Sequence, residues 1–212
     1  MIKNNKAKFI ISVILTLLPI LVGLILWDRL PEVIATHFGV NNQPDGFSSK
    51  GFAVFGMPLI LLAVHILALV VTSRDPKRKN IGNKPLALLF YVVPLVSNVV
   101  MALIYTVALG VGINISIVLS LLFGVIFVLI GNILPKAKQN HTFGLRIYWT
   151  LNNEENWNKT HRLSGFVFVI AGALLIITSP IGKPFILFPI VFAAALIPVI
   201  YSYAYYKKHK QD

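Results

Sequence analysis

The sequence predicts an all-α, polytopic membrane protein with about six transmembrane helices and both termini in the cytoplasm. Three observations lead to this fold class: a mean hydropathy of +0.79 with only 12% charged residues, six long apolar blocks, and the placement of Lys and Arg between those blocks. A soluble domain carries about twice that charged fraction. One small core cannot bury so much apolar surface, which makes lipid the simplest solvent.

A transmembrane helix needs about 20 predominantly apolar residues. The predicted spans are residues 9–27, 51–71, 85–109, 115–134, 163–178 and 185–203. The first span follows Lys3, Lys6 and Lys8, as the core of a secretory signal would. It is too long for such a core and no small-residue cleavage motif follows it, so we interpret it as an uncleaved span.

The fifth span is short and is expected to begin earlier than its apolar block. Asn152 is a residue type that caps helix N-termini, and Glu155 lies three positions further on, as in a capping box. The helix is therefore predicted to begin near Asn153 and to run into the membrane. Three residues at helical spacing then share one face: Trp157, His161 and Ser164.

Orientation follows from the basic residues. Of the 19 Lys and Arg residues, all but Arg29, Lys50 and Lys183 lie at the N-terminus, after the second or fourth span, or in the C-terminal tail. Positive charge is retained on the cytoplasmic side of a membrane, which favours an even number of spans with both ends inside. The formal charge of +12 is thus explained by membrane orientation, and direct nucleic-acid binding is not expected.

Two hydrophilic segments are long enough to carry a function. We divide the chain into an N-terminal two-helix unit, residues 1–84, with an extracellular loop at 28–50, and a C-terminal four-helix unit, residues 85–212, with a cytoplasmic loop at 135–162. The chain has no cysteine, which excludes disulfides, thiolate metal sites and a cysteine nucleophile.

The outer loop contains the turn sequence Pro44-Asp45-Gly46. Residues 33–35 are expected to form a short strand or an interfacial element, and the pattern does not decide between the two. Glu32, His37, Asp45 and Gly46 are the candidate residues for an external ligand such as a cationic peptide. One His and two carboxylates without ligand spacing favour a solvated cap over a metal site, so neither a metal nor a cofactor is predicted.

The inner loop combines aromatic and basic residues, which allows two interpretations. Such a segment anchors at the membrane interface, with its rings at headgroup level and its cations on anionic lipid, or it binds a cytoplasmic partner, because exposed Trp and Arg anchor interfaces. The candidate partner-binding residues are Asn140, His141, Gly144, Arg146, Trp149, Thr150 and Trp157. No nucleophile or metal motif accompanies His141 and His161, so an enzyme is not expected.

Three polar residues fall inside the spans: His65, Asn98 and Asn132. Such residues are costly in lipid and are expected to face the bundle interior. There they form interhelical hydrogen bonds or, in the alternative interpretation, the polar path of a small transporter or exporter. No charged residue lies within a span core, which argues against an ion-coupled pump.

Two segments of the chain resemble known proteins. Between the first two spans stand Leu30-Pro31, His37, Pro44-Asp45-Gly46 and Lys50. From the fourth span onward come Asn132-Ile133-Leu134-Pro135-Lys136, Gln139-Asn140, Phe143-Gly144-Leu145-Arg146, Trp149-Thr150-Leu151, Trp157 and Thr160-His161-Arg162. The first set resembles a small N-terminal domain of the Sdp immunity (SdpI-like) membrane proteins of bacteria, and the second, more specific set is similar to that family's other signature.

The resemblance implies a function that the residues alone do not reveal. The founding member of the family protects a cell against its own secreted toxic peptide, and also draws a DNA-binding repressor to the membrane. By this resemblance, the protein is expected in the bacterial plasma membrane as an immunity and sensor protein, in contact with lipid. Combined with the predicted orientation, the outer loop would face the toxin and the inner loop the cytoplasmic repressor.

Overall fold

A computed structural model describes residues 2–39 and 41–209 of the 212-residue chain. Among these residues, six helices are long and apolar enough to cross a membrane, which confirms the predicted all-α fold with six spans. They include α1 (Lys6–Ile25), α2 (Met57–Ser73), α3 (Asn83–Ala108), α4 (Ile115–Ile133), α6 (Glu154–Thr178) and α7 (Pro184–Lys208). A short helix, α5 (Tyr148–Leu151), precedes α6, and a π-helical turn, Phe52–Gly56, leads into α2.

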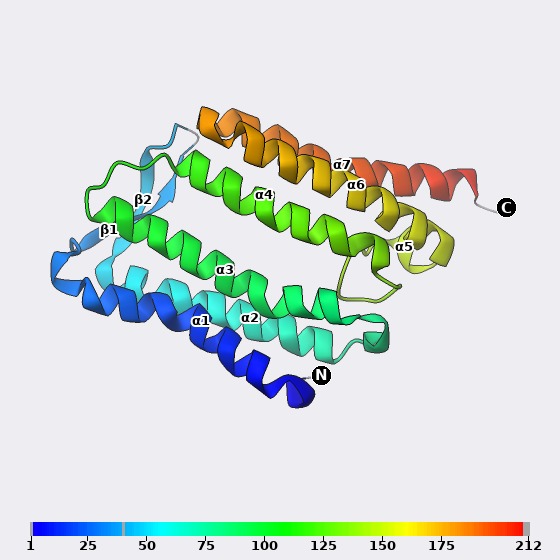
Figure 1. The fold of residues 1–212 in the computed structure, drawn as a ribbon, viewed down its shortest axis with the longest axis horizontal. Coiled ribbons are helices and arrows are strands. Elements are labelled where there is room, and N and C mark those ends of the chain that lie inside the picture. The colour runs from blue at the N-terminus through cyan, green and yellow to red at the C-terminus, as the bar shows by residue number, and fades with distance from the viewer. Residues whose placement is uncertain (1, 40, 210–212) are drawn as a thin grey trace.

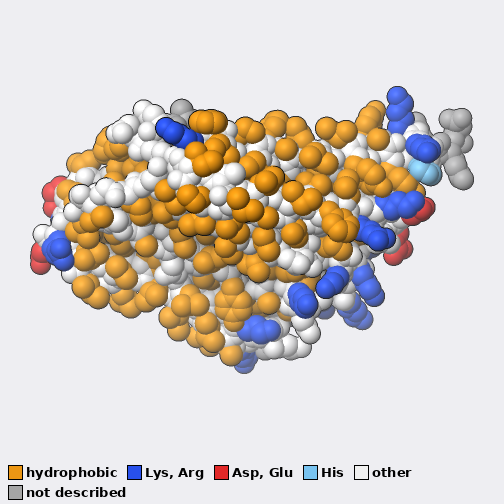
Figure 2. Space-filling view, turned by 45° about the horizontal axis from the view of Figure 1, so that its top comes forward, with side chains coloured by type: hydrophobic (Ala, Val, Ile, Leu, Met, Phe, Trp, Pro, Cys, Tyr) orange, Lys and Arg blue, Asp and Glu red, His pale blue; other side chains and the backbone are white. Residues whose placement is uncertain are grey.

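The helices run along one long axis, so the molecule has two distinct ends (Figure 1). A β-hairpin lies at one end, which we call the hairpin end. Both chain termini and the loop before α6 lie at the opposite end, which we call the terminal end. An even number of spans requires the termini to share one end, as observed. Lys and Arg side chains gather toward the terminal end, beside an apolar flank (Figure 2).

The hairpin consists of β1 (Val33–Phe38) and β2 (Pro44–Ser49), paired antiparallel with a register irregularity near His37. Of the two alternatives for residues 33–35, a short strand or an interfacial element, the structure shows the strand. Ile34 is 1% exposed and fixes the hairpin to the helices below it. At the base of the hairpin, Lys50 Nζ lies 2.7 Å from Glu32 Oε1 and 5.0 Å from the centre of the Trp27 ring.

The apolar core is divided into two clusters. The first lies under the hairpin and contains Leu30, Ile34, Ala53, Val54, Met101, Ile104 and Tyr105. The second joins α4, α6 and α7 through Phe127, Ala171, Leu175, Leu187 and Ala194. In its packing, α3 therefore belongs with α1, α2 and the hairpin. The division of the chain into folding units at residue 84 stays a prediction.

Two pairs of glycines bring α4 and α6 into close contact. A Cβ atom added at Gly131 would lie 2.8 Å from the backbone oxygen of Gly165, and one at Gly172 would lie 2.6 Å from that of Gly124. Within each helix the two glycines are seven residues apart, which places both on the same face. Small residues let backbones approach closely in membrane bundles, where packing drives helix association.

At the terminal end, Asp75 joins the α2–α3 loop to the loop before α6. Its side chain is almost fully buried, with the residue 3% exposed. Asp75 Oδ2 accepts hydrogen bonds from the amide of His141 and the hydroxyl of Thr142, both at 2.8 Å. Asp75 Oδ1 accepts a bond of 2.7 Å from the amide of Lys77. Burial raises the pKa of the Asp75 carboxyl, but these donors favour the charged form and the net shift of the pKa is downward.

Because Asp75 is charged and bonded, we expect Asp75→Asn to destabilise the purified protein at neutral pH by about 1.5–3 kcal/mol. The folded pKa of Asp75 lies below the unfolded value of about 3.9. The stabilisation that the charged Asp75 provides is therefore fully present above the unfolded pKa. It is lost as the pH falls through the lower pKa of the folded state. Thermal unfolding of both proteins across a pH series tests this. A difference in midpoint that persists unchanged at acid pH would contradict the assigned role.

The orientation of the hairpin stays a prediction and is directly measurable. The chain has no cysteine, so a single one introduced at an exposed position gives a unique label. We expect Gln43→Cys to react with a membrane-impermeant maleimide on intact cells. Lys138→Cys at the terminal end should react only after permeabilisation. The reverse pattern would place the hairpin in the cytoplasm.

Candidate functional site

Three of the four residues predicted to face an external ligand gather on the hairpin. His37 Nδ1 lies 2.5 Å from Asp45 Oδ1, and the two side chains are 74% and 53% exposed. Gly46 packs under His37, where an added Cβ would lie 2.8 Å from the histidine Cβ. Glu32 is separate, because it pairs with Lys50 at the hairpin base. Among the described residues, no group of three or more metal-ligating side chains forms.

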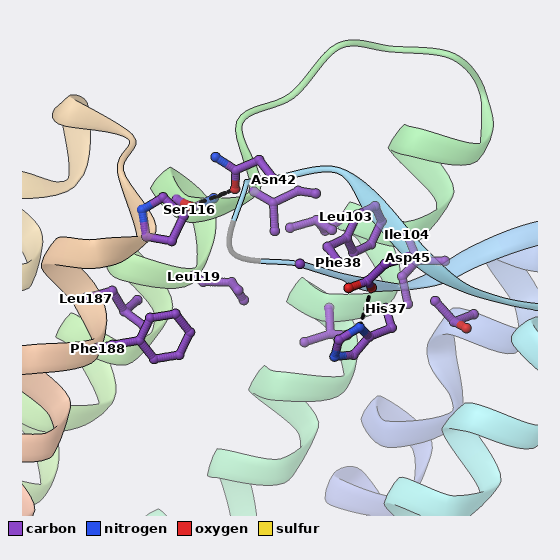
Figure 3. A pocket seen from close by; sticks show the side chains of 15 residues that line it. His37, Phe38, Asn42, Asp45, Leu103, Ile104, Ser116, Leu119, Leu187 and Phe188 are labelled. Carbon is purple, nitrogen blue, oxygen red and sulfur yellow. Dashed lines mark hydrogen bonds and ion pairs between the residues drawn. The ribbon is translucent and has the colours of Figure 1, made fainter.

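The His37–Asp45 pair lies at the edge of a cleft with a volume of about 580 Å³. Figure 3 shows this pair on one side of the cleft and α7 on the other. The apolar walls come from three spans: Leu103 and Ile104 from α3, Leu119 from α4, and Leu187 and Phe188 from α7. A mostly apolar concavity with a few polar groups at one edge is a typical ligand site.

Asn42 lies in the hairpin turn and joins the hairpin to the helices on the opposite side of the cleft. Its backbone φ of 62° is in the left-handed region, which Asn tolerates better than most residues. Asn42 Oδ1 accepts bonds from the amide and the hydroxyl of Ser116, at 3.1 and 2.6 Å. Asn42 Nδ2 donates to Asn114 Oδ1 at 3.3 Å and to the Gly182 oxygen at 3.4 Å. The turn thus connects the hairpin with the start of α4 and with the α6–α7 connection.

Sequence reasoning missed both Asn42 and the apolar walls. The turn-rich segment 41–46 gives a weak signal for Asn42, since Asn is a common turn residue. The wall residues give none, because a leucine that lines a cleft and a leucine that faces lipid look alike in a hydropathy profile.

At the terminal end, several predicted partner-binding residues are buried and fold the loop itself. Asn140 is 1% exposed, and its Oδ1 accepts bonds from the amides of Thr142 and Phe143 at 2.9 and 2.6 Å. Thr150 is fully buried, and its hydroxyl accepts a bond from the amide of Ile147 at 3.1 Å. The sequence predicts that Asn140 and Thr150 contact a partner. Because both are buried, their role is instead to hold the loop in shape.

Trp157 is also buried, with 0% exposure, so the expectation of an exposed tryptophan anchor is wrong at this position. Trp157 Nε1 donates to the Ala137 oxygen at 2.7 Å, and its ring stacks on His161 at 4.0 Å. His161 Nε2 accepts from the amide of Leu145 at 3.0 Å. Gly144 has a φ of 108° and packs on the same ring, where an added Cβ would collide with His161 Nε2. Trp157 and His161 lie on one helix face, as predicted, and they pack with the loop residues Gly144 and Leu145.

The start of α6 agrees with the prediction to within one residue. The helix begins at Glu154, and its N-cap is Asn153, whose side chain accepts a bond of 2.8 Å from the amide of Asn156. Asn152 lies just outside the helix and donates to the Tyr148 oxygen instead.

The remaining predicted inner residues are available at the surface. His141 and Arg146 are exposed, and Arg146 Nη1 donates to the His141 oxygen at 2.9 Å. Trp149 is partly exposed and stacks on Tyr206 of α7, with ring centres 5.9 Å apart. All three residues belong to the segment before α6, which lies at the terminal end (Figure 1).

Two of the three polar residues within the spans face neighbouring helices, as expected. His65 is fully buried, and its Nε2 lies 2.9 Å from the Ser12 hydroxyl of α1. Asn98 donates to the Leu15 oxygen of α1 at 2.7 Å. Both contacts stay within the helices of the first core and hold α1 in place.

Asn132 does not face the bundle interior, and that expectation is wrong. It is exposed and donates to the Val128 oxygen of its own helix at 2.8 Å. The reason is the neighbouring Gly131, which occupies the face of α4 that touches Gly165 and so turns Asn132 away. Among the described residues, no hydrogen bond joins any two of His65, Asn98 and Asn132.

Comparison with known proteins adds a second line of argument. Residues 136–202 match the model of the SdpI/YfhL protein family, and residues 14–62 match a domain of unknown function (DUF1648). Over 211 residues, the chain is 33% identical to the immunity protein SdpI of Bacillus subtilis (strain 168). The alignment covers 95% of this chain and 97% of that protein. No solved structure matches.

The two matched regions contain the features described above. Residues 14–62 include the hairpin, and residues 136–202 include the buried inner loop with α6 and most of α7. Together with the six apolar helices, these matches identify a multi-pass bacterial membrane protein. The chain belongs to the SdpI/YfhL protein family.

Proposed function

We propose that this protein is a membrane immunity protein, which protects the cell that produces it against a secreted antimicrobial peptide. The observation that supports this function best is the 33% identity to the immunity protein SdpI, which extends over nearly the full length of both chains. A similarity of that extent includes the hairpin, the cleft walls and the inner loop alike. A role in binding is further supported by the cleft, which combines apolar walls with an exposed polar edge.

The hairpin end is the proposed toxin-facing surface. The distribution of Lys and Arg predicts that this end lies outside the cell. There the exposed His37 and Asp45 are available to a peptide that arrives from outside. Glu32 adds a third exposed polar group at the hairpin base, where it pairs with the buried Lys50, and Gly46 packs under His37.

The terminal end is the proposed binding surface for a cytoplasmic DNA-binding repressor, which would make the protein a sensor as well. The exposed His141 and Arg146 and the partly exposed Trp149 supply the cationic and aromatic groups that anchor interfaces. The buried Asn140, Thr150 and Trp157 hold the loop in one shape and so position these three side chains.

A survival assay tests immunity. In a Bacillus subtilis strain that lacks SdpI, expression of this chain should raise survival in toxin-containing culture medium from the parent strain at least tenfold over an empty vector. The double variant His37→Ala/Asp45→Ala should lose most of that protection, since it removes the exposed polar edge of the cleft. Asp28→Ala, which removes another exposed carboxylate at the same end, is the matched control and should protect fully. Survival at the empty-vector level, with the wild-type chain present in the membrane fraction, would refute the proposal.

Repressor binding is tested separately from protection. Arg146→Ala and Trp149→Ala should abolish recruitment of a fluorescently tagged repressor to the membrane in toxin-treated cells. Membrane insertion should be unchanged, because both side chains lie outside the helical core. Arg162→Ala removes another exposed arginine and should leave recruitment intact. Full recruitment by the Arg146 and Trp149 variants would exclude this surface.

A further inference from the structure

We infer that the cleft at the hairpin end binds a short peptide segment that places a positively charged group beside apolar side chains. The inference rests on the proposed immunity function and specifies the ligand of that site. It follows from the walls of the cleft, the charge at its edge, and its size.

The two apolar walls of the cleft are each packed into a different core cluster. On one side, Ile104 is a member of the cluster under the hairpin and is 2% exposed. On the other side, Leu187 is a member of the α4–α6–α7 cluster and is 8% exposed. The apolar surface between the walls is already present without a ligand, as is usual for small-ligand sites. Phe188, next to Leu187, is 55% exposed and forms the mouth of the cleft.

The electrostatics of the cleft favour a cation. Among the described residues that line the cleft, Asp45 is the only Asp or Glu, and none is Lys or Arg. Its Oδ1 atom is engaged by His37, whereas its Oδ2 atom has no hydrogen-bond partner among the described residues. In Figure 3 the Asp45 carboxylate lies next to the His37 ring, on the side of the cleft opposite Leu187 and Phe188. A carboxylate beside a low-dielectric wall attracts a cation more strongly than one in bulk water.

The size of the cleft restricts the ligand to a short segment. A volume of about 580 Å³ is within the range of sites that enclose a small molecule. It is too small for a whole transmembrane helix with its side chains, which is about 10–12 Å across. The fitting ligand is a few residues long, with apolar side chains between α3 and α7 and an amine or guanidinium group at Asp45.

Quenching of a fluorescent label by tryptophan peptides tests this inference. Phe188→Cys is labelled with bimane in this otherwise cysteine-free chain and reconstituted into phosphatidylcholine vesicles. The probes are acetyl-Lys-Leu-Leu-Trp-amide and acetyl-Glu-Leu-Leu-Trp-amide, which differ only in charge. We expect the basic peptide to quench the label at a concentration at least tenfold lower. The change Asp45→Asn should reduce that difference to less than twofold.

The control position lies one turn further along α7. Phe192 is 66% exposed and does not line the cleft, so bimane at Phe192→Cys should be quenched weakly and equally by both peptides. Equal quenching by the two peptides at position 188 would overturn the inference, as would a preference that persists in Asp45→Asn. Quenching of position 188 by brominated lipid, but by neither peptide, would assign the cleft to an acyl chain. If any of these results occurred while the wild-type chain still protected cells, the proposed immunity function would be retained and only the assigned ligand would be rejected.

Discussion

The architecture of this protein follows from one constraint: apolar helices gain little by burying side chains against each other when the solvent is itself apolar. Close backbone packing and polar contacts must hold the helices instead. Between α4 and α6, the pairs Gly124–Gly172 and Gly131–Gly165 provide the close packing. At the two ends of the bundle, Asn42 and Asp75 provide polar contacts between segments distant in sequence.

The same constraint explains why the cleft exists. The two core clusters are separate, and the hairpin end joins them through the hydrogen bonds of Asn42 rather than through continuous apolar packing. Space therefore remains between α3 on one side and α4 and α7 on the other. In a soluble protein such a gap would collapse or fill with water. In this bundle each cluster is packed on its own, and the turn residue Asn42 bridges the gap at the hairpin end.

The sequence predicted the parts of the fold that depend on composition. Six apolar blocks became six helices, and the capping pattern placed the start of α6 within one residue. It could not predict side-chain direction at Asn132, because that direction depends on Gly131 contacting a helix distant in sequence. The sequence also contains no sign that Asp75 is important, because it lies in a loop rich in Lys and Arg. In the structure its oxygens join two loops. Pairings between distant segments leave no periodic signal in either partner.

The inner loop shows a second limit of sequence reasoning: residues that look functional in the sequence can have a purely structural role. Asn140, Gly144, Thr150 and Trp157 stand out in the sequence as unusual residues, and an obvious interpretation is that they bind something. In the structure they bind the chain itself, since an irregular loop at the membrane surface must satisfy its own backbone groups. The proposed ligand site needs no such unusual residues, because its lining consists largely of ordinary apolar side chains with one carboxylate. Under the proposed function, the less distinctive residues of the cleft walls are therefore the first positions at which to test ligand selectivity in this chain.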